Sequence, residues 1–268
     1  MLDVLIPFLP LLVAGAIAGF MAGLLGIGGG IVTIPALFIA FSEMGVPIEW
    51  RMHSAIATSL TIIVATNISS VYAHHQKGSV DWGIVKTWWP AIMVGAVTGS
   101  LFAKLLKTSE LIYLFAALAV LLGIKMLFPL DKIKLGEKLP TGFLGYFNPG
   151  LIGFLSALKG IGGGSYSVPY LTLYSTPIHK AVGTASLAGI VISVSGGLGY
   201  LFGGWGMTGL PSGMVGFIHI PSAIVVAISA VLMAPFGAKV AHAVSKTVLS
   251  IVFGVFLILA TTRLLMAA

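Results

Sequence analysis

The sequence contains no cysteine and few charged residues. Cysteine is absent from all 268 residues, which excludes disulfides, thiolate metal ligands and a cysteine nucleophile. Only 8% of the residues are charged, against about 25% in a soluble domain, while 58% are hydrophobic. No Asp, Glu, Lys or Arg lies between Asp3 and Glu43, or between Lys180 and Lys239. Because a bilayer-spanning helix needs about 20 mostly apolar residues, these gaps predict a multi-pass membrane protein.

Acidic residues are absent from the interior of every predicted span. All seven fall at predicted helix ends or in loops: Asp3, Glu43, Glu49, Asp81, Glu110, Asp131 and Glu137. A transporter of cations usually keeps a carboxylate within the membrane, so this distribution favours an anion as the substrate. It also argues against an enzyme with a carboxylate pair or a metal cluster. We therefore expect no catalytic residues, no metal and no cofactor.

The net charge of +7 comes from cations scattered through short loops. This is the pattern of a membrane protein with a positive-inside bias, and it does not indicate nucleic acid. The expected partners are the lipid bilayer and a small anion. Proton coupling and a homo-oligomer stay open.

Stretches without charged residues, and the Gly and Pro residues that separate them, predict an all-α polytopic fold with two halves of five helical segments. The predicted segments are 3–25, 31–42, 53–74, 84–105 and 110–128, followed by 140–158, 165–176, 180–203, 212–237 and 245–265. The predicted organisation is an N-terminal membrane repeat (1–128), a polar connector (129–139) and a C-terminal membrane repeat (140–268). Segments 31–42 and 165–176 are too short to cross a ~30 Å hydrocarbon core at about 1.5 Å per residue. We interpret these two as half-helices or re-entrant segments.

The two halves are related in sequence. Residues 19–37 read GFMAGLLGIGGGIVTIPAL and residues 153–171 read GFLSALKGIGGGSYSVPYL, which align without a gap. We interpret this match as an internal duplication. Five segments per half would place the second half upside down, and the distribution of Lys and Arg between the two sides favours such inverted repeats. Four crossings per half, which would keep the halves parallel, stays an alternative.

Each copy of the repeat contains a run of three glycines. Such a run costs about 1 kcal/mol per residue in a helix, so it predicts an unwound turn between Leu25 and Ile31 and another between Lys159 and Ser165. Unwound backbone at membrane depth must be buried in protein or line a wet cavity, and the helix that follows presents free N–H groups to anions. We therefore predict a midplane anion site made by the glycines of both breaks: Gly28, Gly29, Gly30, Gly162, Gly163 and Gly164. The alternative is close helix packing, which we prefer for the GxxxG-like spacing of Gly15, Gly19 and Gly23.

The second break is the more polar of the two. It carries Lys159, Ser165 and Tyr166 where the first break has Leu25, Ile31 and Val32. Lys159 is interpreted either as a counter-charge for a bound anion or as a lysine that extends to the membrane interface.

Four further residues are substrate-binding candidates. Thr58 and Thr184 occupy equivalent positions in the two halves, and Asn67 carries an amide that needs partners in lipid. His219 could donate to an anion or relay a proton, although a histidine bonded to nearby backbone is the preferred interpretation.

These features together resemble the TauE/SafE sulfite exporter family of bacterial inner-membrane proteins. The resemblance lies in Gly19 to Pro35, in its copy from Gly153 to Pro169, and in the Ala-x-x-Thr patches that end at Thr58 and Thr184. It implies a bacterial inner-membrane location and transport of a sulfur-containing anion such as sulfite or an organosulfonate, in the direction of export. Family members often carry an Asn where this chain has His219.

The favoured function is a secondary transporter that works by alternating access around the two glycine breaks. An anion channel could use the same site. An intramembrane enzyme or an assembly subunit is the third alternative, and the sequence shows no catalytic constellation for it.

Overall fold

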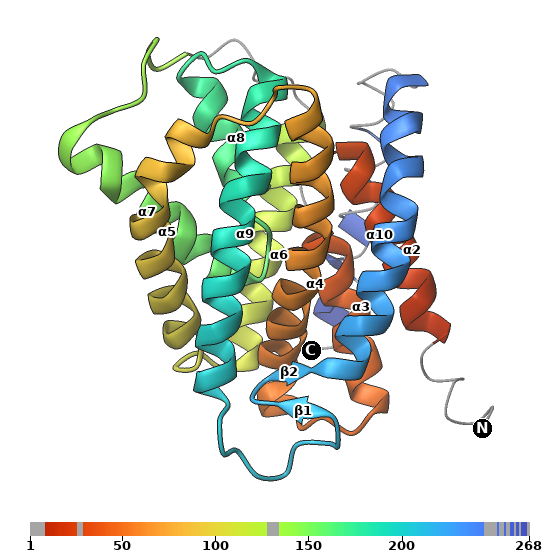
Figure 1. The fold of residues 1–268 in the computed structure, drawn as a ribbon. Coiled ribbons are helices and arrows are strands. Elements are labelled where there is room, and N and C mark those ends of the chain that lie inside the picture. Colours follow the sequence, from red (N-terminus) through yellow and green to blue (C-terminus); the bar gives the residue numbers. More distant parts are fainter. Residues whose placement is uncertain are drawn as a thin grey trace.

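The structure, a computed structural model, describes residues 9–25, 29–127 and 134–243, with isolated positions between 251 and 266. These residues form a helical bundle (Figure 1). The first half contains α2 (Leu9–Leu25), α3 (Gly30–Glu43), α4 (Ile48–Gln76), α5 (Trp82–Ala103) and α6 (Thr108–Leu127). The second half contains α7 (Gly142–Lys159), α8 (Gly164–Leu173), α9 (Ile178–Gly203), a short hairpin of β1 (Met214–Val215) and β2 (Ile218–His219), and α10 (Ile220–Ala243). This confirms the predicted all-α polytopic fold.

Helix length separates spanning segments from short ones. Ile48–Gln76, Ile178–Gly203 and Ile220–Gly237 are long and apolar enough to cross a membrane. In contrast, α3 has 14 residues and α8 has 10, which corresponds to roughly 21 and 15 Å of helix. Both short segments therefore fall below the thickness of a bilayer core, as predicted for half-helices.

The predicted helix over 212–237 begins too early. The chain first forms the β1–β2 hairpin, and α10 begins only at Ile220. Gly213 and Gly216 have φ angles of +89° and +57°, which a right-handed helix does not allow. The predicted segments at the two ends, 3–25 and 245–265, lie partly or largely outside the described residues.

The first helix of each half packs against the fourth helix of the other half. α2 lies along α10, and α7 lies along α5. Both contacts use glycine: a β-carbon on Gly19 would overlap the backbone of Ala230, and one on Gly153 would overlap the carbonyl of Ile92. The close-packing interpretation of Gly15 and Gly19 is thereby confirmed, since both face α10.

The third helices, α4 and α9, pack against each other at the centre and run in opposite directions (Figure 1). Two similar hydrogen bonds join these helices to the opposite half. The backbone N–H of His219 donates to Thr58 Oγ1 of α4 at 3.0 Å, and the N–H of Asp81 donates to Thr184 Oγ1 of α9 at 3.0 Å. The two halves therefore exchange the same contact.

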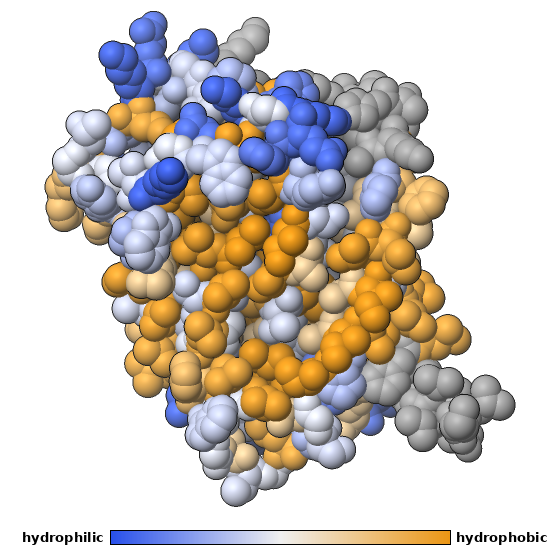
Figure 2. Space-filling view, viewed as in Figure 1, coloured by the Kyte–Doolittle hydropathy of each residue, from blue (hydrophilic) through white to orange (hydrophobic). Residues whose placement is uncertain are grey.

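The face of the molecule seen in Figure 2 is apolar in its middle and more polar toward its ends. In Figure 2 an orange band covers the middle of the visible face, and blue residues gather at the upper end. The upper end holds the α4–α5 loop, residues 134–139 of the connector and the beginnings of α5 and α9, with the cations Lys77, Lys86, Lys134, Lys138 and Lys180. The lower end, which includes the α5–α6 loop and the hairpin, has Arg51, Lys104 and Lys107. This is the surface of a protein that crosses a bilayer, with a bias of cations to one side.

Candidate functional site

The second glycine break interrupts the helix as predicted. α7 ends at Lys159, Gly160 takes a left-handed conformation with φ 65°, and α8 begins at Gly164. The N–H groups of Gly160 and Ile161 close the end of α7 on the carbonyls of Ala157 and Ser156, both at 3.2 Å. Gly162, Gly163 and Gly164 are all buried. Irregular backbone thus lies inside the protein, where membrane-embedded chains tolerate it.

The first break lies against the second. Gly28 falls outside the described residues, while Gly29 caps α3 and Gly30 is its first residue. A β-carbon on Gly30 would lie 2.6 Å from the carbonyl oxygen of Gly160. Glycine is therefore needed at position 30 because the backbones of the two halves meet there.

Two hydroxyls tie the breaks together. Thr33 Oγ1 lies 3.3 Å from the Gly30 carbonyl and 2.8 Å from Ser59 Oγ, and Ser59 Oγ donates to the Gly160 carbonyl at 3.3 Å. The sequence analysis did not propose Thr33 or Ser59 as site residues. One signal was present, because Thr33 and Ser167 are hydroxyl residues at equivalent positions of the repeat.

Lys159 is buried inside the protein with a relative exposure of 6%. Its ammonium donates to the hydroxyl of Tyr166 at 2.8 Å and lies 5.4 Å from the centroid of that ring. Within the described ranges it has no carboxylate partner. A lysine that extends to the membrane interface would be exposed, so the structure favours an internal cation with unused hydrogen-bonding capacity.

Several buried polar groups at the second break and next to it also lack partners among the described residues. They are Asn67 Nδ2 and the hydroxyls of Ser156, Ser165 and Ser167. Asn67 reaches the second break from α4: a β-carbon on Gly189 of α9 would overlap Asn67 Nδ2 and lie 3.4 Å from the nitrogen of Gly163. Buried donors without partners cost free energy, and a bound ligand with acceptor oxygens would satisfy them.

The other predicted site residues hold the ends of helices. Thr58 and Thr184 are fully buried, and each hydroxyl accepts a backbone N–H from the segment that precedes the next helix of the other half. His219 begins α10 much as Asp81 begins α5. His219 Nδ1 accepts the N–H of Ser222 at 3.3 Å, and Asp81 Oδ1 accepts the N–H of Ile84 at 3.2 Å. His219 is thus hydrogen-bonded within its own helix end, as the preferred interpretation of this residue expected.

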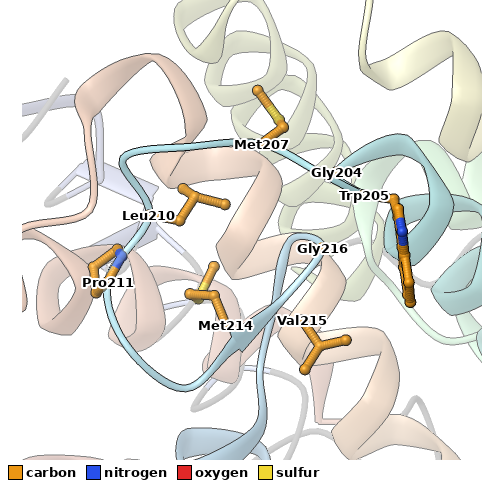
Figure 3. Close-up of a pocket in the computed structure, with 9 residues that line it drawn as sticks. Gly204, Trp205, Met207, Leu210, Pro211, Met214, Val215 and Gly216 are labelled. Atoms are coloured by element: carbon orange, nitrogen blue, oxygen red, sulfur yellow. The ribbon is translucent and has the colours of Figure 1, made fainter.

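Two cavities lie away from the breaks. One, of about 260 Å³, is enclosed by the loop between α9 and β2, and Figure 3 shows Met207, Leu210 and Met214 around it. It contains none of the predicted site residues. The other, of about 500 Å³, lies at the upper end between the beginnings of α5 and α7.

In the described part of the chain, no three His, Asp or Glu side chains lie close enough together to hold a metal ion. The second break instead offers an ammonium, an amide, hydroxyls and backbone N–H groups. These are donors, and such a set suits an anion with several acceptor oxygens.

Comparison with known proteins shows which family the chain resembles. The family model "Sulfite exporter TauE/SafE" matches residues 11–264, which is nearly the whole chain. A "Probable membrane transporter protein" of Haemophilus influenzae is 33% identical over 247 residues, covering 92% of this chain and 94% of the relative. A "Probable membrane transporter protein" of Methanocaldococcus jannaschii is 28% identical over 263 residues, with 92% and 93% covered.

The relative YunE of Bacillus subtilis, also named a "Probable membrane transporter protein", is 27% identical over 216 residues, covering 74% of this chain and 79% of the relative. No solved structure matches the chain significantly. The family match and these relatives identify a membrane transporter and not an enzyme. The chain belongs to the TauE/SafE family of membrane transporters.

Proposed function

We propose that this protein is a secondary transporter that exports a small sulfur-containing anion such as sulfite or an organosulfonate. The observation that carries the proposal is Lys159, a buried residue at the start of the second glycine break whose ammonium has one hydroxyl partner among the described residues. A buried charge is costly unless a counter-charge accompanies it, and an anionic substrate would supply one.

The proposed ligand site lies on the second break. Lys159 would provide the counter-charge, Asn67 and Ser165 the hydrogen bonds, and the beginning of α8 the backbone N–H groups of Gly163 and Gly164. A tetrahedral or pyramidal oxyanion presents enough acceptor oxygens for all of them. The name of the matched family supports a sulfur oxyanion as this ligand.

Alternating access is the proposed mode of transport. The antiparallel pair α4 and α9, with its exchanged threonine contacts, supports an inverted repeat in which one half can adopt the conformation of the other. The buried state of residues 159–165 supports a site that opens only when the halves move. The bias of cations to the upper end supports a cytoplasmic location for that end, in a bacterial inner membrane.

The test combines ligand binding with transport. Sulfite and methanesulfonate binding would be measured by calorimetry on the purified protein and on Lys159→Met, and counterflow would be measured in proteoliposomes. We expect Lys159→Met to weaken binding about 10- to 100-fold, because a charge-assisted contact is lost. The melting temperature should rise, because an uncompensated charge leaves the interior.

The matched control is Lys104→Met, which removes an exposed lysine at the end of α5. It should change neither binding nor melting temperature. Unchanged affinity in Lys159→Met would retire the proposed site. Unitary currents in place of saturable counterflow would show that the protein is a channel.

A further inference from the structure

Helix α8 carries tyrosines at one-turn intervals. Tyr166 and Tyr170 lie on α8, and Tyr174 caps its end, whereas the equivalent positions of α3 are Val32, Ala36 and Ala40. Residues four apart share one face of a helix. A row of phenols thus extends from Lys159 toward the upper end of the molecule, and only the second half has it.

Tyr166 and Tyr170 contact different partners along α8. Tyr166 accepts the hydrogen bond of Lys159 at 2.8 Å, and Tyr170 accepts one from Asn148 Nδ2 of α7 at 2.9 Å. The Tyr170 ring lies 5.1 Å from that of Tyr174 and 5.6 Å from that of Trp88 on α5. Tyr170 therefore closes the space between α5, α7 and α8.

The cavity at the upper end is next to Tyr170 by way of Trp88. Its volume is about 500 Å³, and its lining includes Trp88, Thr87, Leu139, Thr141 and Gly145. Trp88 thus lines the cavity and also touches Tyr170. Volumes of this size are typical of sites that admit small molecules.

We propose that this cavity is the access vestibule of the Lys159 site and that the hydrogen bond between Asn148 and Tyr170 is the gate between them. The proposal rests on the proposed anion site at Lys159. The bond joins α7 to α8 across the route, so it has to break when an anion passes. Asp81 at the rim caps α5 through Ile84, and the cations of the upper end outnumber its charge.

Because the chain has no cysteine, a single introduced thiol can report how a thiol reagent reaches a chosen position. Ser165→Cys places a single thiol at the deep site, and Thr141→Cys places one in the vestibule. Each reporter would be reconstituted in vesicles and treated from one face or the other with anionic sulfonatoethyl methanethiosulfonate. Tyr170→Phe removes the gate hydroxyl and keeps the ring, and Asn148→Ala removes the other partner. Tyr113→Phe, an exposed tyrosine of α6, is the matched control.

We expect the reagent to reach the deep thiol of Ser165→Cys from the lysine-rich face. Tyr170→Phe and Asn148→Ala should each accelerate this modification about threefold to tenfold, which corresponds to one lost hydrogen bond. The modification rate of the vestibule thiol in Thr141→Cys should stay the same, and Tyr113→Phe should have no effect. The gate would be overturned if Tyr170→Phe and Asn148→Ala left the modification rate of the deep thiol unchanged. It would also be overturned if the reagent reached this thiol from the opposite face alone.

A second readout separates this proposal from the proposed function. Methanesulfonate should protect the deep thiol, and the cationic trimethylammonioethyl reagent should react with it more slowly than the anionic one because Lys159 repels the cation. If methanesulfonate gave no protection and the two reagents reacted at equal rates, while the gate variants still accelerated modification, the result would count against the anion site alone. Intact protection without a gate effect would count against the gate alone.

Discussion

At the first break, the side chain of Ile63 packs against Gly30, with its Cδ1 only 2.9 Å from the place of a β-carbon. At the second break, the equivalent residue of α9 is Gly189, and the amide of Asn67 lies in the space that an isoleucine would fill. The two breaks have the same glycines but different neighbours. The duplicated backbone thus has the side chain of Ile63 beside one break and the amide of Asn67 beside the other.

Filling the space at the second break should have the largest effect. Gly189→Ile copies Ile63 into α9, where the new side chain would overlap Asn67 and crowd Gly163. We expect methanesulfonate binding to be lost and the free energy of unfolding to fall by roughly 1–3 kcal/mol, the usual cost of overpacking. Calorimetry and thermal denaturation in detergent would measure the two.

Gly197→Ala on the same helix is the matched control, because no atom lies within 4 Å of its β-carbon position. It should leave binding unchanged. Wild-type affinity in Gly189→Ile would show that the space beside Asn67 has no part in the site.

The two threonine contacts should contribute equally to stability, whereas the two breaks should differ in ligand binding. Thr58→Val and Thr184→Val each leave a backbone N–H, of His219 or Asp81, without its acceptor. Each should lower the free energy of unfolding by roughly 1–3 kcal/mol. Strongly different losses in denaturation experiments would mean that the halves do not share this contact in solution.

Removing the amide of Asn67 should weaken binding with little loss of stability. Asn67→Ala deletes a donor that has no partner in the structure, so the affinity for methanesulfonate should fall about threefold to tenfold. Ser193→Ala, at the equivalent position of α9, is the control, because this hydroxyl donates to the Gly189 carbonyl of its own helix. Equal affinities in the two variants would remove Asn67 from the site.

The smallest effects on stability are expected from substitutions of Thr33 and of its counterpart Ser167. Thr33→Val breaks the contact with Ser59 that joins the two breaks and should cost about 1 kcal/mol of stability. Ser167→Ala deletes a hydroxyl without a partner and should change stability by less than about 0.5 kcal/mol. Melting temperatures that rank the two variants in the opposite order would contradict the described hydrogen bonds.

Much of the fold could be predicted from the sequence because its signals are local. Apolar runs predicted the helices, and consecutive glycines predicted the break after Lys159, since both depend on residues close together in the chain. The hairpin at 214–219 was missed because its apolar composition resembles that of a helix. The positive φ angles of Gly213 and Gly216 became visible only in the structure.

The candidate site was predictable only in part. Lys159 stood out as a charge in an apolar repeat, and Asn67 as an amide in a spanning helix. The contacts of Ser59 with Gly160 and of His219 with Thr58 join residues 101 and 161 positions apart, which no local pattern reveals. Thr58, Thr184 and His219 take part in hydrogen bonds at the beginnings of α5 and α10, and their contact with substrate stays a prediction.

The sequence by itself determined that this is a duplicated membrane protein with a broken helix in each half, because composition and repeated glycines are written directly in the chain. Only the tertiary structure decided that the two breaks touch and that the second one receives the polar lining. The physical reason is that α4 crosses between the halves, so that Asn67 fills the space left by Gly189 while Ile63 closes the first break.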